Sequence, residues 1–203
     1  MAQSHGGRVI LVRHGETEAN LRRCFADSDD IPLTDAGRVQ AHELALRLAR
    51  EFRPEVLISS TFLRARQTSE IIGRVLGLEV EMIQGIQERD FGCLKGHPYK
   101  RLGESMSRDG LGDPASLMRT WKPAGGESLE DVRRRSIQAI EALRDRYPGR
   151  EITIVSHGAV IQAVCAHVTG EWSDASVPPN CGVVTVDYDA QGWTVPPVKR
   201  LSS

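Results

Sequence analysis

Short apolar runs alternate along this chain with longer stretches in which apolar residues recur every three or four positions. The short runs predict strands at 8–12, 55–59, 78–83, 151–156, 183–188 and 193–195. The longer stretches predict helices at 34–51, 61–76, 128–146 and 159–168. Strands that alternate with helices are typical of a mostly parallel sheet with helices on both faces. The pattern therefore predicts an α/β fold.

Two parts of the chain interrupt this alternation. Residues 84–121 hold several glycines, Pro98 and Pro114, and only weak helical periodicity, which predicts a loop-rich insertion over the sheet. Near the end, Asp189-Ala190-Gln191-Gly192 predicts the turn of a terminal hairpin. Neither segment has the composition of a linker, so residues 1–203 are expected to form a single domain.

Composition and charge narrow the class of protein. The formal net charge of -1 argues against nucleic acid as a partner, because nucleic-acid-binding domains are usually strongly basic. No apolar run approaches the ~20 residues that a bilayer span needs, and Met1 to Gly7 lack the apolar core of a signal peptide. We therefore expect a cytoplasmic protein without a membrane partner. The four cysteines carry no CxxC pair and are expected to be reduced thiols: Cys24, Cys93, Cys165 and Cys181.

Two of the predicted strands end in the same way. Val12 is followed by Arg13-His14-Gly15, and Val155 is followed by Ser156-His157-Gly158. In open α/β sheets ligands bind beyond the carboxyl ends of the strands, so both imidazoles would project into one crevice if the strands are neighbours. A third strand ends at Ser59 and is followed closely by Arg64. Histidines among arginines indicate an anion site, and no metal is expected, because divalent cations prefer carboxylate oxygens.

These residue types suit phosphoryl chemistry. The guanidinium forks of Arg13 and Arg64 match phosphate oxygens bidentately. A neutral imidazole can attack phosphorus, so one histidine would be the nucleophile while the other donates to the phosphoryl oxygens. The leaving alkoxide needs an acid whose pKa is raised, as happens to a carboxyl group beside a phosphate dianion. Glu88 is best placed by sequence, and Asp90 is the alternative.

Four segments together resemble one known family. Leu11 to Asn20 closely resembles the RHG signature of the histidine phosphatase superfamily (branch 1), which includes the cofactor-dependent phosphoglycerate mutases. Three later segments resemble the further motifs of this family, in the same order: Ser59 to Thr68, Glu88 to Gly96 and Val155 to Gly158. The resemblance covers about residues 8–188 and implies a phosphoglycerate mutase-like, three-layer α/β/α sandwich around a mostly parallel sheet.

The resemblance also implies residue roles. His14 would be the phosphorylated nucleophile, His157 the second histidine of the pocket, and Glu88 the proton donor. Arg13 and Arg64 would clamp the phosphate, although Arg66 competes with Arg64. The remaining substrate-binding positions would be Thr17, Asn20 and Gly158. In phosphatase members, a residue such as Glu127 or Ser128 sometimes faces the pocket, but Ser128 also fits a helix cap with Asp131.

Within the family, the sequence favours hydrolysis over phosphoryl transfer between positions of a substrate. Mutases typically carry a Tyr in the acid loop and a Gly-Leu-Asn-Lys run after it. This chain has Phe91 at the first position and Gly96-His97-Pro98-Tyr99 in place of the run. We therefore expect a phosphatase of a small phosphorylated metabolite that needs no cofactor. A mutase and a non-catalytic relative are the alternatives, and whether the chain forms a homo-oligomer stays open.

The sequence offers two interpretations of substrate choice. A second anionic group of the substrate could bind to basic residues that lie near the motifs. These residues are Arg22, Arg23, Lys95, Lys100 and Arg101. These could equally be solvated surface charges. In that case selectivity would come from apolar surface that suits a larger leaving group, at Phe25, Met106, Met118 and Trp121. His97 is a further candidate for contact with the substrate.

Overall fold

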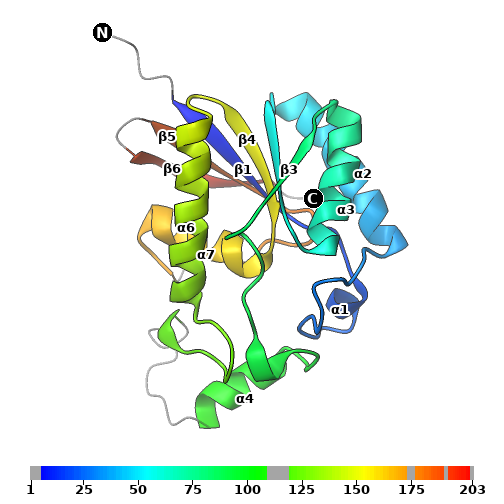
Figure 1. Cartoon of the computed structure of the whole chain (residues 1–203), viewed down its shortest axis with the longest axis vertical. Coiled ribbons are helices and arrows are strands. Elements are labelled where there is room, and N and C mark those ends of the chain that lie inside the picture. The colour runs from blue at the N-terminus through cyan, green and yellow to red at the C-terminus, as the bar shows by residue number, and fades with distance from the viewer. Residues whose placement is uncertain (1–5, 109–118, 173–176, 190–191, 202–203) are drawn as a thin grey trace.

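The computed structural model describes residues 6–108, 119–172, 177–189 and 192–201 of the chain (Figure 1). The strands are β1 (Gly7–Arg13), β2 (Val56–Ser60), β3 (Val80–Ile83), β4 (Glu151–Ser156), β5 (Val183–Asp189) and β6 (Gly192–Leu201). The helices are α1 (Glu18–Leu21), α2 (Asp35–Glu51), α3 (Leu63–Leu76), α4 (Lys100–Arg108), α6 (Leu129–Arg146) and α7 (Gly158–Thr169). A 3₁₀ turn, η1, covers Gly92–Leu94.

The strands form one sheet in the order β3-β2-β4-β1-β5-β6. β3, β2, β4 and β1 pair in parallel, whereas β5 lies antiparallel to β1, and β6 antiparallel to β5. The predicted mostly parallel α/β sheet is confirmed. The parallel register brings Arg13 opposite Ser156, so β1 and β4 end side by side.

Alternate residues of the central strands bury opposite faces of this sheet. In β1, Val9 and Leu11 belong to the core beneath α6 and α7, whereas Ile10 and Val12 belong to the core beneath α2 and α3. Figure 1 shows these two pairs of helices on opposite sides of the sheet. Burial on both faces explains the unbroken apolar runs of the sequence. The result is the expected three-layer sandwich.

Local signals fix where the helices begin and end. The Thr34 hydroxyl accepts the backbone N–H of Gly37 at the start of α2. Ser128 and Asp131 cap α6 reciprocally, each side chain accepting from the other's backbone N–H. At the end of α3, Gly77 adopts a left-handed conformation with φ 68°, which a residue with a side chain rarely adopts.

The predicted loop-rich insertion is wrong in one respect, because it contains η1 and the helix α4. The sequence of α4 has few apolar residues, but Leu102 and Met106, one turn apart, pack against a cluster built on Phe25, Leu94 and Trp121. This tertiary contact stabilises a helix that local periodicity does not predict.

Two further differences concern the last strand and a short helix. The last strand is much longer than the predicted 193–195, because β6 pairs with β5 up to Leu201 opposite Val183. The short helix α1 was not predicted. Two of the predictions lie outside the described residues: Met118, and Ala190-Gln191 of the hairpin turn.

Among the helices described, none is both long enough and apolar enough to span a membrane.

Candidate active site

The carboxyl ends of β1 and β4 bring the two motif histidines together. His14 and His157 each follow the last residue of one of these neighbouring strands, and their ring centroids lie 5.2 Å apart. The backbone N–H of His14 donates to the carbonyl of Ser156 at 3.0 Å and joins the two strand ends. The sheet topology therefore brings the two imidazoles together as expected, but only His14 lines the cavity.

A close contact between two glycines shapes the loop that follows His14. A Cβ atom on Gly15 would lie 2.5 Å from the backbone oxygen of Gly37 in the first turn of α2. Any side chain at Gly15 would therefore displace backbone. The glycine of the Arg-His-Gly motif allows the loop to pack directly on α2.

His14 is held as a neutral imidazole with one nitrogen available. Its side chain is 3% exposed, and its Nδ1 lies 2.7 Å from the carbonyl oxygen of Gly15. A carbonyl only accepts hydrogen bonds, so Nδ1 carries the proton and the Nε2 lone pair stays available. Burial, together with the charges of Arg64 and Arg13, holds the pKa of His14 well below its ordinary value. Both conditions suit a nucleophile.

His157 lies behind His14 instead of on the wall of the cavity. Its side chain has no exposed surface, its Nε2 lies 2.8 Å from the Ser60 hydroxyl, and its ring meets the edge of Phe62. Its Nδ1 has no partner among the described residues. Burial, then the nearby Arg64 and His14, hold the pKa of His157 well below its ordinary value. The geometry fits a neutral imidazole that supports His14.

Two arginines supply donors at this end of the cavity. Arg13 donates from Nη1 to the carbonyl of Pro178 at 2.7 Å, and its Nε is buried without a partner among the described residues. Arg64, in the first turn of α3, is 3% exposed and lies over the ring of Phe62. Both side chains line the cavity, whereas Arg66 does not. Guanidinium groups of this kind match the geometry of a phosphate, so the arrangement is suited to an anion.

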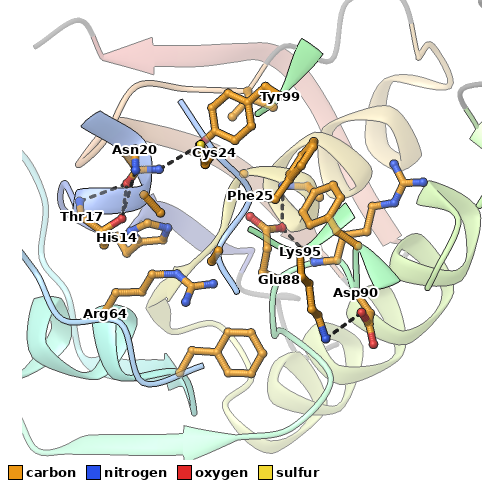
Figure 2. Close-up of a pocket in the computed structure, with 18 of the residues that line it drawn as sticks. His14, Thr17, Asn20, Cys24, Phe25, Arg64, Glu88, Asp90, Lys95 and Tyr99 are labelled. Atoms are coloured by element: carbon orange, nitrogen blue, oxygen red, sulfur yellow. Dashed lines mark hydrogen bonds and ion pairs between the residues drawn. The ribbon is translucent and has the colours of Figure 1, made fainter. Parts of the chain in front are cut away.

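Glu88 faces these groups across the cavity. Its Oε1 accepts the backbone N–H groups of Arg89 at 2.9 Å and of Ala159, in the first turn of α7, at 3.1 Å. Its Oε2 has no partner within the described part of the chain. Figure 2 shows the side chains of His14, Arg64 and Glu88 directed toward the same space. The structure thus places a carboxyl group where a leaving oxygen could receive a proton.

Asp90, the alternative acid, also lines the cavity but is committed elsewhere. It pairs with the ammonium group of Lys95 at 2.9 Å and accepts the backbone N–H of Gly92 at 2.8 Å. Burial acts to raise the pKa of Asp90, but the Gly92 hydrogen bond and the Lys95 charge outweigh it, and the pKa is lowered. A carboxyl group with a lowered pKa is a poor proton donor.

The remaining predicted substrate-binding residues line the cavity as well. Thr17 caps α1 and donates its hydroxyl to the amide oxygen of Asn20 at 3.0 Å, while the Asn20 Nδ2 donates to the Tyr99 hydroxyl at 3.3 Å. Gly158 opens α7, and a Cβ there would lie 2.7 Å from the side chain of Val177. All of these positions belong to one cavity of about 510 Å³.

Asn180 is a residue of the site that the sequence did not reveal. Its Nδ2 donates to the backbone carbonyl of His14 at 3.0 Å and to the amide oxygen of Asn20 at 3.1 Å. The next residue, Cys181, donates its backbone N–H to the carbonyl of Arg13 at 3.1 Å. The turn-rich run Pro178-Pro179-Asn180-Cys181-Gly182 is the only local signal, and it indicates a turn without indicating its partners.

Three other residues that the sequence suggested as contacts of the substrate do not line the cavity. His97 is exposed and is not part of the cavity wall. Glu127 forms an ion pair with Arg135 and accepts the backbone N–H of Asp90 at 2.9 Å, so it holds the acid loop in place. Ser128 caps α6, as its sequence context also suggested.

No described residues form a plausible metal site. Among them, no group of three or more His, Cys, Asp or Glu side chains is arranged to hold an ion. Independence from metals stays a prediction that an assay must test.

Comparisons with known proteins agree with this geometry. The family model for the histidine phosphatase superfamily (branch 1) matches residues 9–199. The chain is 30% identical to the metal-independent phosphoserine phosphatase of Arabidopsis thaliana over 194 residues, 95% of this chain and 81% of that protein. It is 31% identical to a probable phosphoglycerate mutase of Escherichia coli over 199 residues, 93% of this chain and 90% of that protein.

A solved structure is similar to this chain in its fold. The phosphoserine phosphatase of Entamoeba histolytica, in complex with 3-phosphoglyceric acid, superposes with a TM-score of 0.78 at 27% sequence identity. The alignment covers 97% of this chain and 98% of that chain. The similarity therefore extends over the sheet and the crevice at its carboxyl ends.

Proposed function

The chain belongs to the histidine phosphatase superfamily (branch 1) and is a phosphomonoester hydrolase, and we propose that it acts through a phosphohistidine on His14. One observation carries the proposal. The Nδ1 of His14 lies at hydrogen-bond distance from the Gly15 carbonyl, which leaves Nε2 available in a cavity that Arg13 and Arg64 also line. The physiological substrate is then a small phosphorylated metabolite, and no cofactor takes part.

In the first step, the Nε2 lone pair of His14 attacks the phosphorus atom. The bond between phosphorus and the ester oxygen breaks, and Glu88, entering as the carboxylic acid, donates its proton to the leaving oxygen. Arg13 and Arg64 hold the phosphoryl oxygens and stabilise their charge in the transition state. Approach of the phosphate dianion favours the protonated form of Glu88, because two like charges repel each other.

In the second step, water attacks the phosphorus atom and the bond between phosphorus and Nε2 breaks. The Glu88 carboxylate takes a proton from the attacking water, which restores the acid for the next cycle. Inorganic phosphate leaves, and His14 returns to its neutral form with Nδ1 still donating to Gly15. His157 supports His14 through the contact between their rings, and Thr17, Asn20 and Gly158 line the phosphate end.

A panel of phosphomonoesters assayed in excess EDTA tests this function. We expect hydrolysis to continue in EDTA, and we expect His14→Ala to abolish it while His97→Ala, an exposed position, leaves it unchanged. Addition of 2,3-bisphosphoglycerate distinguishes the mutase alternative. Strong stimulation of phosphoglycerate isomerisation would contradict the proposal, whereas unaffected hydrolysis supports it. The cytoplasmic location is part of the proposal and is tested by cell fractionation.

A further inference from the structure

The cavity changes character with distance from His14. Part of its wall is formed by Phe25, Phe91, Tyr99 and Leu102, which we call the aromatic wall. Phe25 contacts Phe91 with ring centroids 4.1 Å apart and Tyr99 at 5.0 Å. The buried side chains of Leu94 and Trp121 support these residues from behind. The wall thus offers a firm apolar surface to the leaving group of a substrate.

Hydrogen bonds join the aromatic wall to the insertion and, through Asn20, to the phosphate end. Phe25 donates its N–H to the carbonyl of His97 at 2.9 Å, and Gly96 donates back to the carbonyl of Phe25 at 3.0 Å. The Tyr99 hydroxyl accepts from Asn20, which also lines the phosphate end. A leaving group bound on the wall is therefore held at a fixed distance from the phosphoryl group.

The cations beside the wall are already committed. Lys95 pairs with Asp90 at 2.9 Å. Arg89 donates to the carbonyls of Glu127 at 2.8 Å and Trp121 at 3.1 Å. The other two described cations that line the cavity, Arg13 and Arg64, are the ones assigned to the phosphate.

The other basic residues that the sequence offered for a second anion lie elsewhere. Arg22, Arg23, Lys100 and Arg101 do not line the cavity, and Arg22 and Arg101 pair with Glu18 and Glu104. By contrast, the acidic residues Asp29, Glu88 and Asp90 do line it. A carboxylate on the substrate would therefore have to compete with the present partners of Lys95 and Arg89, and it would lie among three acidic side chains.

We propose that the aromatic wall is a subsite for an uncharged, apolar leaving group, so that the enzyme prefers alkyl and aryl phosphates to phosphorylated acids. This inference rests on the proposed function, because it takes the phosphate to lie between His14 and the two arginines. Each methylene that the wall removes from water is expected to raise kcat/KM about fourfold. Carboxylated esters such as phosphoserine and 3-phosphoglycerate are expected at the bottom of the series.

The test measures kcat/KM for ethyl, butyl, hexyl and phenyl phosphate, and for phosphoserine and 3-phosphoglycerate. A rise with chain length in the wild-type enzyme, with the two acids lowest, is the expected result. A higher kcat/KM for either acid, or a flat series, would overturn the subsite. Loss of activity on every ester, including the ethyl ester, would instead contradict the proposed function.

Two variants of Leu102 make the test specific to the aromatic wall. Leu102→Ala is expected to flatten the dependence on chain length. Leu102→Arg is expected to lower kcat/KM on hexyl phosphate and to raise it on phosphoserine, a gain that misfolding cannot produce. The matched control is Leu46→Arg, at an exposed position of α2, which should change neither. If Leu102→Arg and Leu46→Arg behave alike, the aromatic wall does not select the leaving group.

Discussion

Two buried neutral histidines should make the protein sensitive to mild acid. His14 and His157 are 3% and 0% exposed, and burial and the Arg64 charge hold both pKa values well below the ordinary one. In the unfolded chain both titrate near a pKa of about 6.5. Below that pH the unfolded chain binds protons that the native protein does not bind. The free energy of unfolding therefore falls as the pH drops from about 6.5 toward the native pKa values.

The size of this effect follows from linkage. Each imidazole that is neutral in the native state contributes a slope of up to about 1.4 kcal/mol per pH unit below the unfolded pKa. Between about pH 7.5 and about pH 5.5, this amounts to at most roughly 1 kcal/mol for one histidine and roughly 3 kcal/mol for the pair. Carboxyl groups with lowered pKa values, such as Asp131, lose their contribution at a lower pH, outside this interval.

Urea unfolding at the two pH values measures the effect. The comparison is between the wild-type protein and a double variant, His14→Gln with His157→Gln, which removes both imidazoles. The variant can be less stable at both pH values, but the wild type should lose up to roughly 3 kcal/mol more of its unfolding free energy on acidification. His97→Gln, at an exposed position, is the control. Equal losses in the wild type and the double variant would refute the neutral state of the pair.

Three further changes separate the roles of individual side chains. Glu88→Gln should lower kcat/KM on ethyl phosphate roughly 100-fold and much less on p-nitrophenyl phosphate, whose leaving group needs little protonation; equal losses would move the acid role to another residue. Arg64→Lys should weaken inhibition by inorganic phosphate at least tenfold, roughly the loss of one charged hydrogen bond, whereas Arg66→Lys should not change it. Asn180→Ala removes one of the donors to the His14 carbonyl and one of the donors to the Asn20 amide oxygen, at about 1 kcal/mol per hydrogen bond, so kcat should fall and thermal unfolding should shift to lower temperature. An unchanged kcat in that variant would show that Asn180 does not position His14.

The histidines and arginines could be predicted from the sequence because local patterns carry the information. A buried parallel strand is an unbroken apolar run, and the residue after it must lie at the carboxyl edge of the sheet. His14 and His157 satisfy this rule in two strands, and the structure places those strands side by side. This rule does not say how deeply each side chain is buried, so it does not predict that His157 lies behind His14.

The residues that the sequence did not reveal depend on distant contacts. Asn180 meets the carbonyl of His14 across 166 positions of the chain. The helix α4 exists because Leu102 and Met106 cover an aromatic cluster, and local periodicity holds no trace of that cluster. Likewise, the sequence does not show that Lys95, a candidate for binding a substrate anion, forms an ion pair with Asp90.

The most direct test of the account is to trap the covalent intermediate. The enzyme is mixed with a phosphomonoester, quenched in denaturant at alkaline pH during turnover, and analysed as peptides by mass spectrometry. We expect one phosphate on His14, stable in base and lost in acid, and none on the same peptide of the His14→Ala variant. Full turnover with no phosphate on His14 at any quench time, or with phosphate on another residue, would contradict it.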